Sequence, residues 1–196
     1  MKTVYWVLGA IGSGKSIISD YLFSEPPFKS LEYLGSDLYK KQFFDYDANK
    51  SKIGYRCADD LVFYRLHKLC ISNVDFIFEF CPTNRNKLNT IKAIFKKYGY
   101  SVIAFFIGTD NRSVNRKRCS ERENAGADPV DPSKVLARYD EALFRIPELL
   151  SVSTRLYLVD NSDIDGLKLV AYFTKKKAYV LQPDCVWLKK LNSIFN

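Results

Sequence analysis

Hydrophobic residues occur along this chain in short continuous runs that alternate with longer segments of helical periodicity. The short runs are rich in β-branched and aromatic residues, which is typical of buried strands. They cover residues 3–8, 31–34, 75–79, 101–107 and 156–159. We take the run at 156–159 as the last core strand.

Between these runs the apolar residues are three or four positions apart, the spacing of an amphipathic helix. The predicted helices cover residues 16–23, 59–72, 84–98, 111–124 and 133–150. Pro26 and Pro27 end the first of them, and Gly99 follows the third as a glycine cap. The tail from 172 to 191 is expected to add a short strand at 179–181 and a final helix.

Strands and helices therefore alternate along most of the chain. This order predicts an α/β fold in three layers, with a mostly parallel sheet between two layers of helices. A length of 196 residues without internal repeats suits one domain spanning residues 1–196. Sheets of this kind bind ligands beyond the carboxyl ends of their strands.

Composition narrows the classes of function. The net charge of +8 favours an anionic partner, which could be a nucleotide, a nucleotide-sugar or RNA. Five cysteines without a C-x-x-C pair suit a reducing compartment, so we expect a cytoplasmic protein. No apolar run approaches the roughly 20 residues of a membrane helix. His67 is the single histidine and lies in a helical pattern, which argues against zinc or histidine-dependent catalysis.

One motif carries specific chemistry. Residues 9–16 match G-x-x-x-x-G-K-[ST] in full, between a predicted strand and a predicted helix. Such a P-loop curls so that backbone N–H groups point at phosphate oxygens, its lysine reaches the β- and γ-phosphates, and its serine hydroxyl binds Mg²⁺. The motif predicts ATP and Mg²⁺ as cofactors, with Ser16 as the magnesium ligand. The residues assigned to the cofactor are Gly9, Gly12, Ser13, Gly14, Lys15 and Ser16.

The fold prediction is thus a P-loop NTPase. The chain lacks the N-K-x-D string of GTPases and the L-S-G-G-Q string of transporter ATPases. What remains favours a small-molecule kinase with an arginine-rich lid at about residues 110–132.

Two acids follow predicted strands on the side where a phosphoryl acceptor would lie. Asp37 could orient the acceptor hydroxyl and take its proton, or it could simply cap a helix beginning at Leu38. Glu79 ends an apolar strand, where a charge needs water, a metal ion or a substrate to stabilise it. We expect both acids to face the acceptor.

The segment 111–124 is crowded with basic residues, which form either a solvated face or a phosphate clamp. Arginines in such a clamp would stabilise the charge that develops as the phosphoryl group is transferred. The basic residues are Arg112, Arg116, Lys117, Arg118 and Arg122.

These residues together resemble the zeta toxin family and its compact bacterial relatives described as ABC-type ATPase-like. The resemblance spans about residues 3–162. It runs through the P-loop, Asp37, Phe78-Glu79 with Arg85 six positions on, Tyr98-Gly99-Tyr100, Arg118-x-x-x-Arg122, the Gly126 loop with Val130 and Pro132, Arg138-Tyr139 and Asp160-Asn161-Ser162.

The resemblance implies an ATP-dependent kinase that phosphorylates a hydroxyl of a UDP-amino sugar such as UDP-N-acetylglucosamine, and an antitoxin protein as a partner. It implies Lys15, Asp37, Arg118 and Arg122 as catalytic residues. By the same analogy Glu79, Arg85 and Arg138 join Asp37 in substrate binding, with Arg138, like Arg118 and Arg122, reaching phosphates.

Two other functions stay open at this point. The basic charge and the abundant Tyr and Phe residues suit a nucleic-acid kinase that acts on 5′ or 3′ ends. Alternatively, ATP could order the lid of a binding or regulatory protein that phosphorylates nothing. The C-terminal 30 residues carry no motif that assigns them to the site.

Overall fold

A computed structural model describes residues 1–26, 28–43, 51–127, 129–163 and 166–191. Seven strands form one sheet in the order β2-β3-β1-β4-β5-β6-β7. The strands are β1 (Thr3–Gly9), β2 (Glu32–Leu34), β3 (Phe76–Phe80), β4 (Ser101–Gly108), β5 (Arg155–Asp160), β6 (Lys168–Thr174) and β7 (Ala178–Val180). The first five are parallel, and β6 and β7 are antiparallel to their neighbours. The predicted three-layer α/β fold with a mostly parallel sheet is confirmed.

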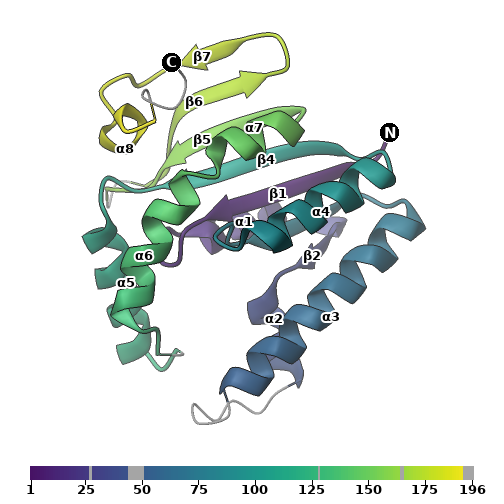
Figure 1. Ribbon diagram of the computed structural model, residues 1–196, viewed down its shortest axis with the longest axis horizontal. Helices are drawn as coiled ribbons and strands as arrows, with labels where there is room; N and C mark the ends of the chain where they lie inside the picture. Colours follow the sequence, from purple (N-terminus) through teal and green to yellow (C-terminus); the bar gives the residue numbers. More distant parts are fainter. Residues whose placement is uncertain (27, 44–50, 128, 164–165, 192–196) are drawn as a thin grey trace.

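Helices cover both faces of this sheet, but unequally (Figure 1). The main core joins the even-numbered positions of the central strands β1, β3 and β4 to helices on one face, and a smaller cluster joins the other face to α1 and a 3₁₀ turn at Phe28–Ser30. The helices are α1 (Lys15–Ser24), α2 (Ser36–Phe43), α3 (Ser51–Ser72), α4 (Arg85–Lys97), α5 (Arg112–Asn124), α6 (Pro132–Leu143), α7 (Ile146–Val152) and α8 (Val186–Lys189). No described helix is long and apolar enough to cross a membrane.

The central strands are buried because they are apolar on both faces. Phe76, Ile77 and Phe78 of β3 are all fully or nearly fully buried, as expected of a strand enclosed between two layers. Trp6 of β1 lies at the centre of the main core, edge-on to Phe95 of α4 with ring centroids 5.3 Å apart. The strands that carry the P-loop and Glu79 therefore lie within the main core.

Two sequence predictions are wrong in this region. The expected single helix at 133–150 is two helices, α6 and α7, with a break at Phe144 and Arg145. Pro147 explains the break, because its ring would clash with the carbonyl of Leu143 in a continuous helix. The segment 156–159 is also not the last core strand, since β6 follows it and buries Val170, Ala171 and Phe173.

The C-terminal segment closes one end of the sheet. Trp187 of α8 is fully buried, and its indole Nε1 donates to Asp160 Oδ1 over 2.8 Å. A Cβ at Gly108 would lie 2.4 Å from the same indole ring, so the glycine makes room for it. The tail thus packs against the carboxyl ends of β4 and β5 without adding a group to the P-loop.

Candidate functional site

The P-loop between β1 and α1 is shaped by contacts from behind. Gly12 and Gly14 have left-handed φ angles of 76° and 92°. A Cβ on Gly12 would lie 2.5 Å from the Asn115 carbonyl oxygen, and one on Gly14 would lie 2.1 Å from Asn161 Nδ2. A Cβ on Gly9 would come within 2.6 Å of the Ile107 carbonyl oxygen. Glycine is therefore required by backbone conformation and by the neighbouring elements.

On the loop itself, four backbone N–H groups belong to consecutive or nearly consecutive residues. They are the N–H groups of Gly12, Gly14, Lys15 and Ser16, and none has a hydrogen-bond acceptor among the residues the structure describes. Three of them open α1, where the helix dipole adds positive potential. Unpaired donors at a helix N-terminus are an anion-binding arrangement.

The side chains of the loop divide into two groups. Lys15 Nζ donates to the Ala10 carbonyl oxygen over 3.1 Å, an interaction that a phosphate can replace, and Ser16 is exposed in the first turn of α1. Ser13 faces inward: its carbonyl oxygen accepts from Asn161 Nδ2 over 2.8 Å, and its hydroxyl is buried without a partner among the described residues. Ser13 thus shapes the loop rather than presenting its side chain to a ligand.

Glu79 lies beside the P-loop, because β3 pairs directly with β1. Its Oε2 accepts from Tyr33 Oη over 2.7 Å and from Ser19 Oγ over 3.3 Å. Ser19 is one turn after Ser16 on α1, so the two hydroxyls lie on the same side of that helix. Burial, and then the Glu79 carboxylate, raises the pKa of Tyr33, which keeps its hydroxyl a donor. The sequence placed Glu79 at the end of this strand, whereas β3 continues for one more residue, to Phe80; Glu79 pairs with Val7, just before the cofactor loop.

Asp37 is exposed in the first turn of α2. That helix begins at Ser36, so the alternative that Asp37 caps a helix beginning at Leu38 is wrong. Its carboxylate lies close enough to Tyr33 to contribute to the raised pKa of that phenol. Asp37 and Glu79 therefore approach the same tyrosine from two elements, and the role of Asp37 as acceptor base stays a prediction.

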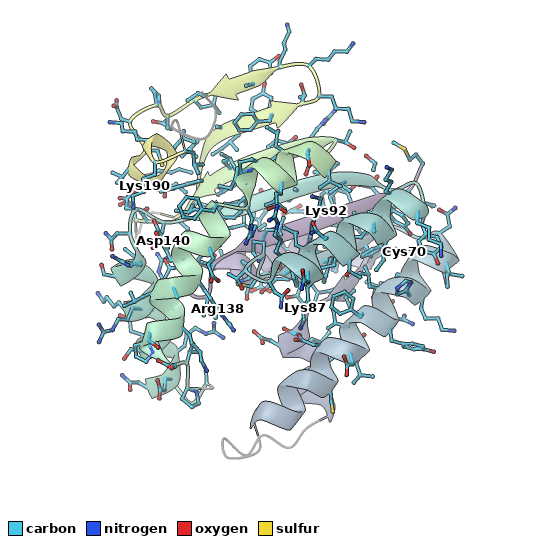
Figure 2. The ribbon with its side chains drawn as sticks, viewed as in Figure 1. Cys70, Lys87, Lys92, Arg138, Asp140 and Lys190 are labelled. Atoms are coloured by element: carbon cyan, nitrogen blue, oxygen red, sulfur yellow. The ribbon has the colours of Figure 1, made fainter. Side chains whose placement is uncertain are left out.

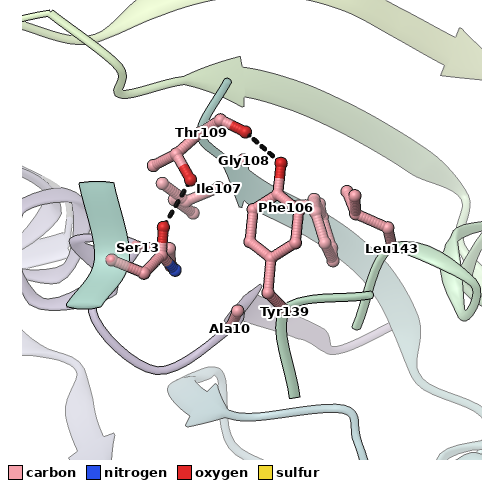
Figure 3. A pocket seen from close by; sticks show the side chains of 9 residues that line it. Ala10, Ser13, Phe106, Ile107, Gly108, Thr109, Tyr139 and Leu143 are labelled. Carbon is pink, nitrogen blue, oxygen red and sulfur yellow. Dashed lines mark hydrogen bonds between the residues drawn. The ribbon is translucent and has the colours of Figure 1, made fainter. Parts of the chain in front are cut away.

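A buried polar network joins α5 to the P-loop, and Figure 3 shows the part of it around Thr109 and Tyr139. Asn115 is fully buried; its Nδ2 donates to the Ile11 carbonyl oxygen over 2.7 Å, and its Oδ1 accepts from the Thr109 hydroxyl. Tyr139 of α6 donates to the Thr109 carbonyl oxygen over 2.5 Å. The predicted lid segment is thus fixed at its base to the P-loop, and residue 128 of that segment lies outside the described residues.

The predicted phosphate-binding arginines occupy different environments. Arg118 Nη1 donates to the Asn161 carbonyl oxygen over 2.7 Å. Burial raises the pKa of the Cys119 thiol, and Arg122 and Lys15 lower it again, so both cations lie near a thiol that touches the P-loop at Gly12. Arg122, one turn after Cys119 on α5, is therefore on the same side of the helix as the residue that faces the P-loop. Arg118 instead ties α5 to the loop that follows β5.

The two other predicted arginines, Arg138 and Arg85, lie on helices α6 and α4. Arg138 is exposed, and its side chain extends from α6 (Figure 2). Arg85 opens α4 just after β3, and its Nε lies 3.4 Å from Glu148 Oε1 of α7. Roles in substrate binding stay predictions for both.

Sequence reasoning missed several of these residues. Tyr33, Ser19, Arg145 and Glu148 gave no signal because their roles depend on contacts between distant elements. Asn115 gave a weak signal, because it is an uncharged polar residue in a helix that is otherwise rich in basic residues. The structure shows that it is fully buried.

Comparison with known proteins gives one family and several similar folds. Residues 4–146 match the model of the AAA domain family. No curated protein matches the sequence. Among solved structures, AvrRxo1-ORF1 in complex with AvrRxo1-ORF2 has a TM-score of 0.69 at 14% identity, over 95% of this chain and 62% of that one. This chain thus spans less than two thirds of that relative.

Two further structures have similar folds. The PezAT chromosomal toxin–antitoxin system of Streptococcus pneumoniae gives a TM-score of 0.67 at 16% identity, over 100% of this chain and 87% of that one. Shikimate kinase from Acinetobacter baumannii gives 0.52 at 15% identity, over 100% and 94%. The TM-scores show that this chain shares the fold of these proteins. The family match covers well over half of the sequence and includes the whole glycine-rich loop, so this chain belongs to the AAA domain family.

Proposed function

We propose that this chain is an ATP-dependent phosphotransferase that moves the γ-phosphoryl group of ATP to a hydroxyl of a small metabolite. The observation that carries the proposal is the set of four unpaired N–H groups on the P-loop, beside Lys15 and next to an acid-bearing strand end. Another structure of AvrRxo1-ORF1 with AvrRxo1-ORF2 contains ATP, and this chain matches it with a TM-score of 0.69. This similarity supports ATP as the nucleotide.

On the nucleotide side, the N–H groups would cradle phosphate oxygens while Lys15 exchanges the Ala10 carbonyl for the β- and γ-phosphates. The residues present also suit Mg²⁺, which prefers oxygen ligands: the exposed Ser16 hydroxyl and the Glu79 carboxylate lie on adjacent elements. When bound, the ion would neutralise charge that develops on the transferred phosphoryl group. Arg122 would add to this from α5.

On the acceptor side, Asp37 would orient the hydroxyl and take its proton, because it is exposed and belongs to the element next to the Tyr33 and Glu79 pair. Glu79 would bind the acceptor or a water on the metal, held in place by Tyr33 and Ser19. Arg85 and Arg138 would contact the acceptor or its phosphates. Arg118 is assigned a different role from the one the resemblance implies, since its guanidinium positions the Asn161 loop that supports Gly14.

The acceptor we propose is a nucleotide-sugar of the UDP-N-acetylglucosamine type. The resemblance to zeta toxins in the sequence motivates this choice of acceptor. Similarities in fold support a partner protein of the antitoxin kind, since PezAT is a toxin–antitoxin system and AvrRxo1-ORF1 was crystallised with a second protein.

The test is a phosphotransfer assay with a panel of acceptors. Purified protein is incubated with ATP, Mg²⁺ and nucleotide-sugars, nucleosides or RNA ends, and products are identified by mass. Lys15→Ala should abolish transfer, whereas Lys117→Ala, a charge-matched change at an exposed residue of α5, should leave it intact. Undiminished transfer by the Lys15→Ala protein would falsify the proposal.

Asp37→Asn separates a kinase from an ATP-gated binding protein. A kinase should lose turnover and keep its ATP affinity, because Asp37 acts on the acceptor. Turnover and ATP affinity that both stay at wild-type values in this variant would contradict the assignment of Asp37 as the base.

A further inference from the structure

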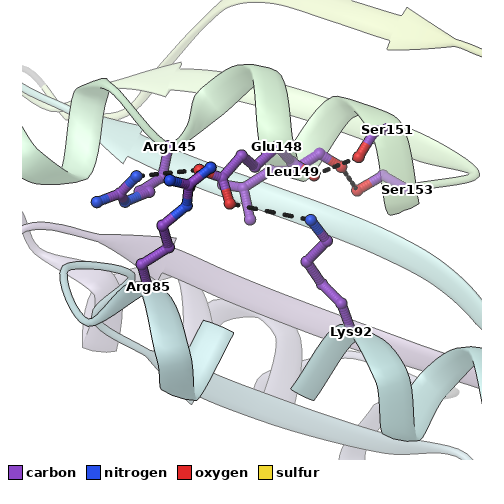
Figure 4. A network of polar contacts seen from close by, with 7 residues as sticks. All are labelled: Arg85, Lys92, Arg145, Glu148, Leu149, Ser151 and Ser153. Carbon is purple, nitrogen blue, oxygen red and sulfur yellow. Dashed lines mark hydrogen bonds and ion pairs between the residues drawn. The ribbon is translucent and has the colours of Figure 1, made fainter. Parts of the chain in front are cut away.

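A cluster of charges between α4 and α7 contains more cations than its one carboxylate can neutralise (Figure 4). Glu148 Oε1 lies 3.0 Å from Arg145 Nη1 and 3.4 Å from Arg85 Nε, and Glu148 Oε2 lies 3.9 Å from Lys92 Nζ. Among the described residues no other carboxylate pairs with these three cations. The cluster therefore keeps two unbalanced positive charges.

Part of this surplus is partly buried, where an unbalanced charge is expensive. The side chains of Arg145, Glu148 and Lys92 are only 21%, 20% and 24% exposed, so water screens their repulsion only in part. Arg145 Nε is buried and has no hydrogen-bond partner among the described residues. A single structural ion pair would need one cation, and the two additional ones indicate that a second anion belongs here.

The cluster begins near the carboxyl end of β3, the end of the sheet to which the proposed function assigns the acceptor. Arg85 is the first residue of α4, which begins five residues after β3 ends, and β3 carries Glu79. The nucleotide phosphates, in contrast, are assigned to the P-loop at the start of α1. The N-terminal end of α4 adds its own positive potential near Arg85. An anion bound here would therefore belong to the acceptor and not to ATP.

We propose that Arg85, Arg145 and Lys92 form a subsite for a phosphate group of the acceptor, and that Glu148 is an internal carboxylate that competes with this phosphate. The inference rests on the proposed kinase function and adds one feature of its acceptor, which is a phosphate group that this cluster would bind. Arginine suits this role because its planar donors bind phosphate in a bidentate manner.

The contacts indicate which residue moves. Arg85 is 66% exposed, so it can turn toward a phosphate at little cost. Glu148 keeps Arg145 at 3.0 Å when Arg85 leaves, so its charge stays paired. Lys92 lies two turns after Arg85 on the same face of α4 and approaches the same Glu148 carboxylate.

The experiment is a binding titration by calorimetry with the P-loop filled by a non-hydrolysable ATP analogue. The probes are N-acetylglucosamine, N-acetylglucosamine 1-phosphate and UDP-N-acetylglucosamine. We expect both phosphorylated probes to bind at least tenfold more tightly than the neutral sugar. Arg85→Gln and Arg145→Gln should remove most of that difference, and the exposed Arg85 keeps the test valid if the Arg145 variant does not fold.

Glu148→Gln gives the sharpest result, since removing the competing carboxylate should tighten binding of the phosphorylated probes several-fold. A purely structural Glu148 would instead leave their affinity unchanged or weaken it. Glu141→Gln and Arg155→Gln are matched controls at exposed residues outside the cluster, and neither should alter the preference for phosphate. Equal affinity for all three probes, or no gain with Glu148→Gln, overturns the subsite.

The two proposals fail separately. Tight, cluster-dependent binding of a phosphorylated sugar without any phosphotransfer would refute the kinase and retain the subsite. Transfer to an uncharged sugar that is insensitive to Arg85→Gln would refute the subsite and retain the kinase.

Discussion

Asn115→Leu tests whether the base of α5 sets the shape of the P-loop. Leucine has the branching of asparagine, although it is larger, and it cannot bond with the Ile11 carbonyl oxygen or the Thr109 hydroxyl, both of which lose their Asn115 partner. Asn115 and Thr109 are fully buried, so each lost partner costs about 1–3 kcal/mol. Since leucine regains some apolar burial, we expect the free energy of unfolding to fall by about 2–4 kcal/mol.

The Ile11 carbonyl would then be free to turn, and the N–H groups of Gly12 and Gly14 would lose their fixed direction. A loss of about 1.4 kcal/mol in phosphate binding corresponds to an ATP affinity about tenfold weaker. The measurements are urea unfolding and titration with a fluorescent ATP analogue, at a temperature where the variant is folded.

Tyr100→Phe provides the control for stability. The Tyr100 hydroxyl donates to the Val74 and Leu69 carbonyl oxygens over 2.7 and 3.2 Å, near the amino end of β4 and away from the P-loop. This change should also destabilise the fold, by about 1–3 kcal/mol, without altering ATP affinity. If Asn115→Leu loses stability to the same extent and binds ATP like the wild type, the network does not shape the loop.

Three further outcomes are expected. Gly12→Ala should abolish nucleotide binding and destabilise the fold, because the added Cβ meets the backbone of α5. Gly126 has a similar φ of 87°, but a Cβ there would have nothing within 4 Å. In unfolding measurements, Gly126→Ala should therefore cost only the backbone strain of about 1–2 kcal/mol. Tyr33→Phe should lower phosphotransfer at unchanged ATP affinity, and Tyr157→Phe, on the same face of the sheet, should not; equal rates for the two variants would exclude Tyr33 as a positioning residue. Burial raises the pKa of Tyr100 to about 12 from an ordinary 10. The stabilising contribution of the protonated Tyr100 hydroxyl is therefore complete below pH 10 and is lost as pH rises toward 12. Between pH 10 and 12, the free energy of unfolding should fall less steeply with pH for Tyr100→Phe than for the wild type.

The sequence predicted the parts of this molecule that depend on local pattern. The five parallel strands and the P-loop follow from runs of apolar residues and from one motif whose spacing is fixed by phosphate geometry. The break between α6 and α7 was missed although Pro147 marks it, because the apolar spacing continues across the break. Strand β6 was missed because Lys168 and the lysines after Thr174 hide a buried centre of Val170, Ala171 and Phe173.

The site was predictable only in part, for a related reason. Lys15, Ser16 and Glu79 could be found because each lies at the end of a strand or in a motif. The residues that hold them in place could not, since Tyr33 reaches Glu79 across 46 positions and Asn115 reaches Ile11 across 104. Contacts of that range depend on the finished topology, which no local pattern encodes.

The charge distribution connects these observations. A chain of net charge +8 could carry its excess on any solvated face, and much of it does, as the exposed pairs Lys117–Glu121 and Lys189–Asp184 show. At Glu148, however, Arg145 and Lys92 share one carboxylate at partial burial, where an unbalanced charge destabilises the fold. Stability alone favours replacing one of them by a neutral residue. Their presence is best explained by a phosphate that binds there, and the cluster is an observation separate from the P-loop motif from which the kinase was inferred.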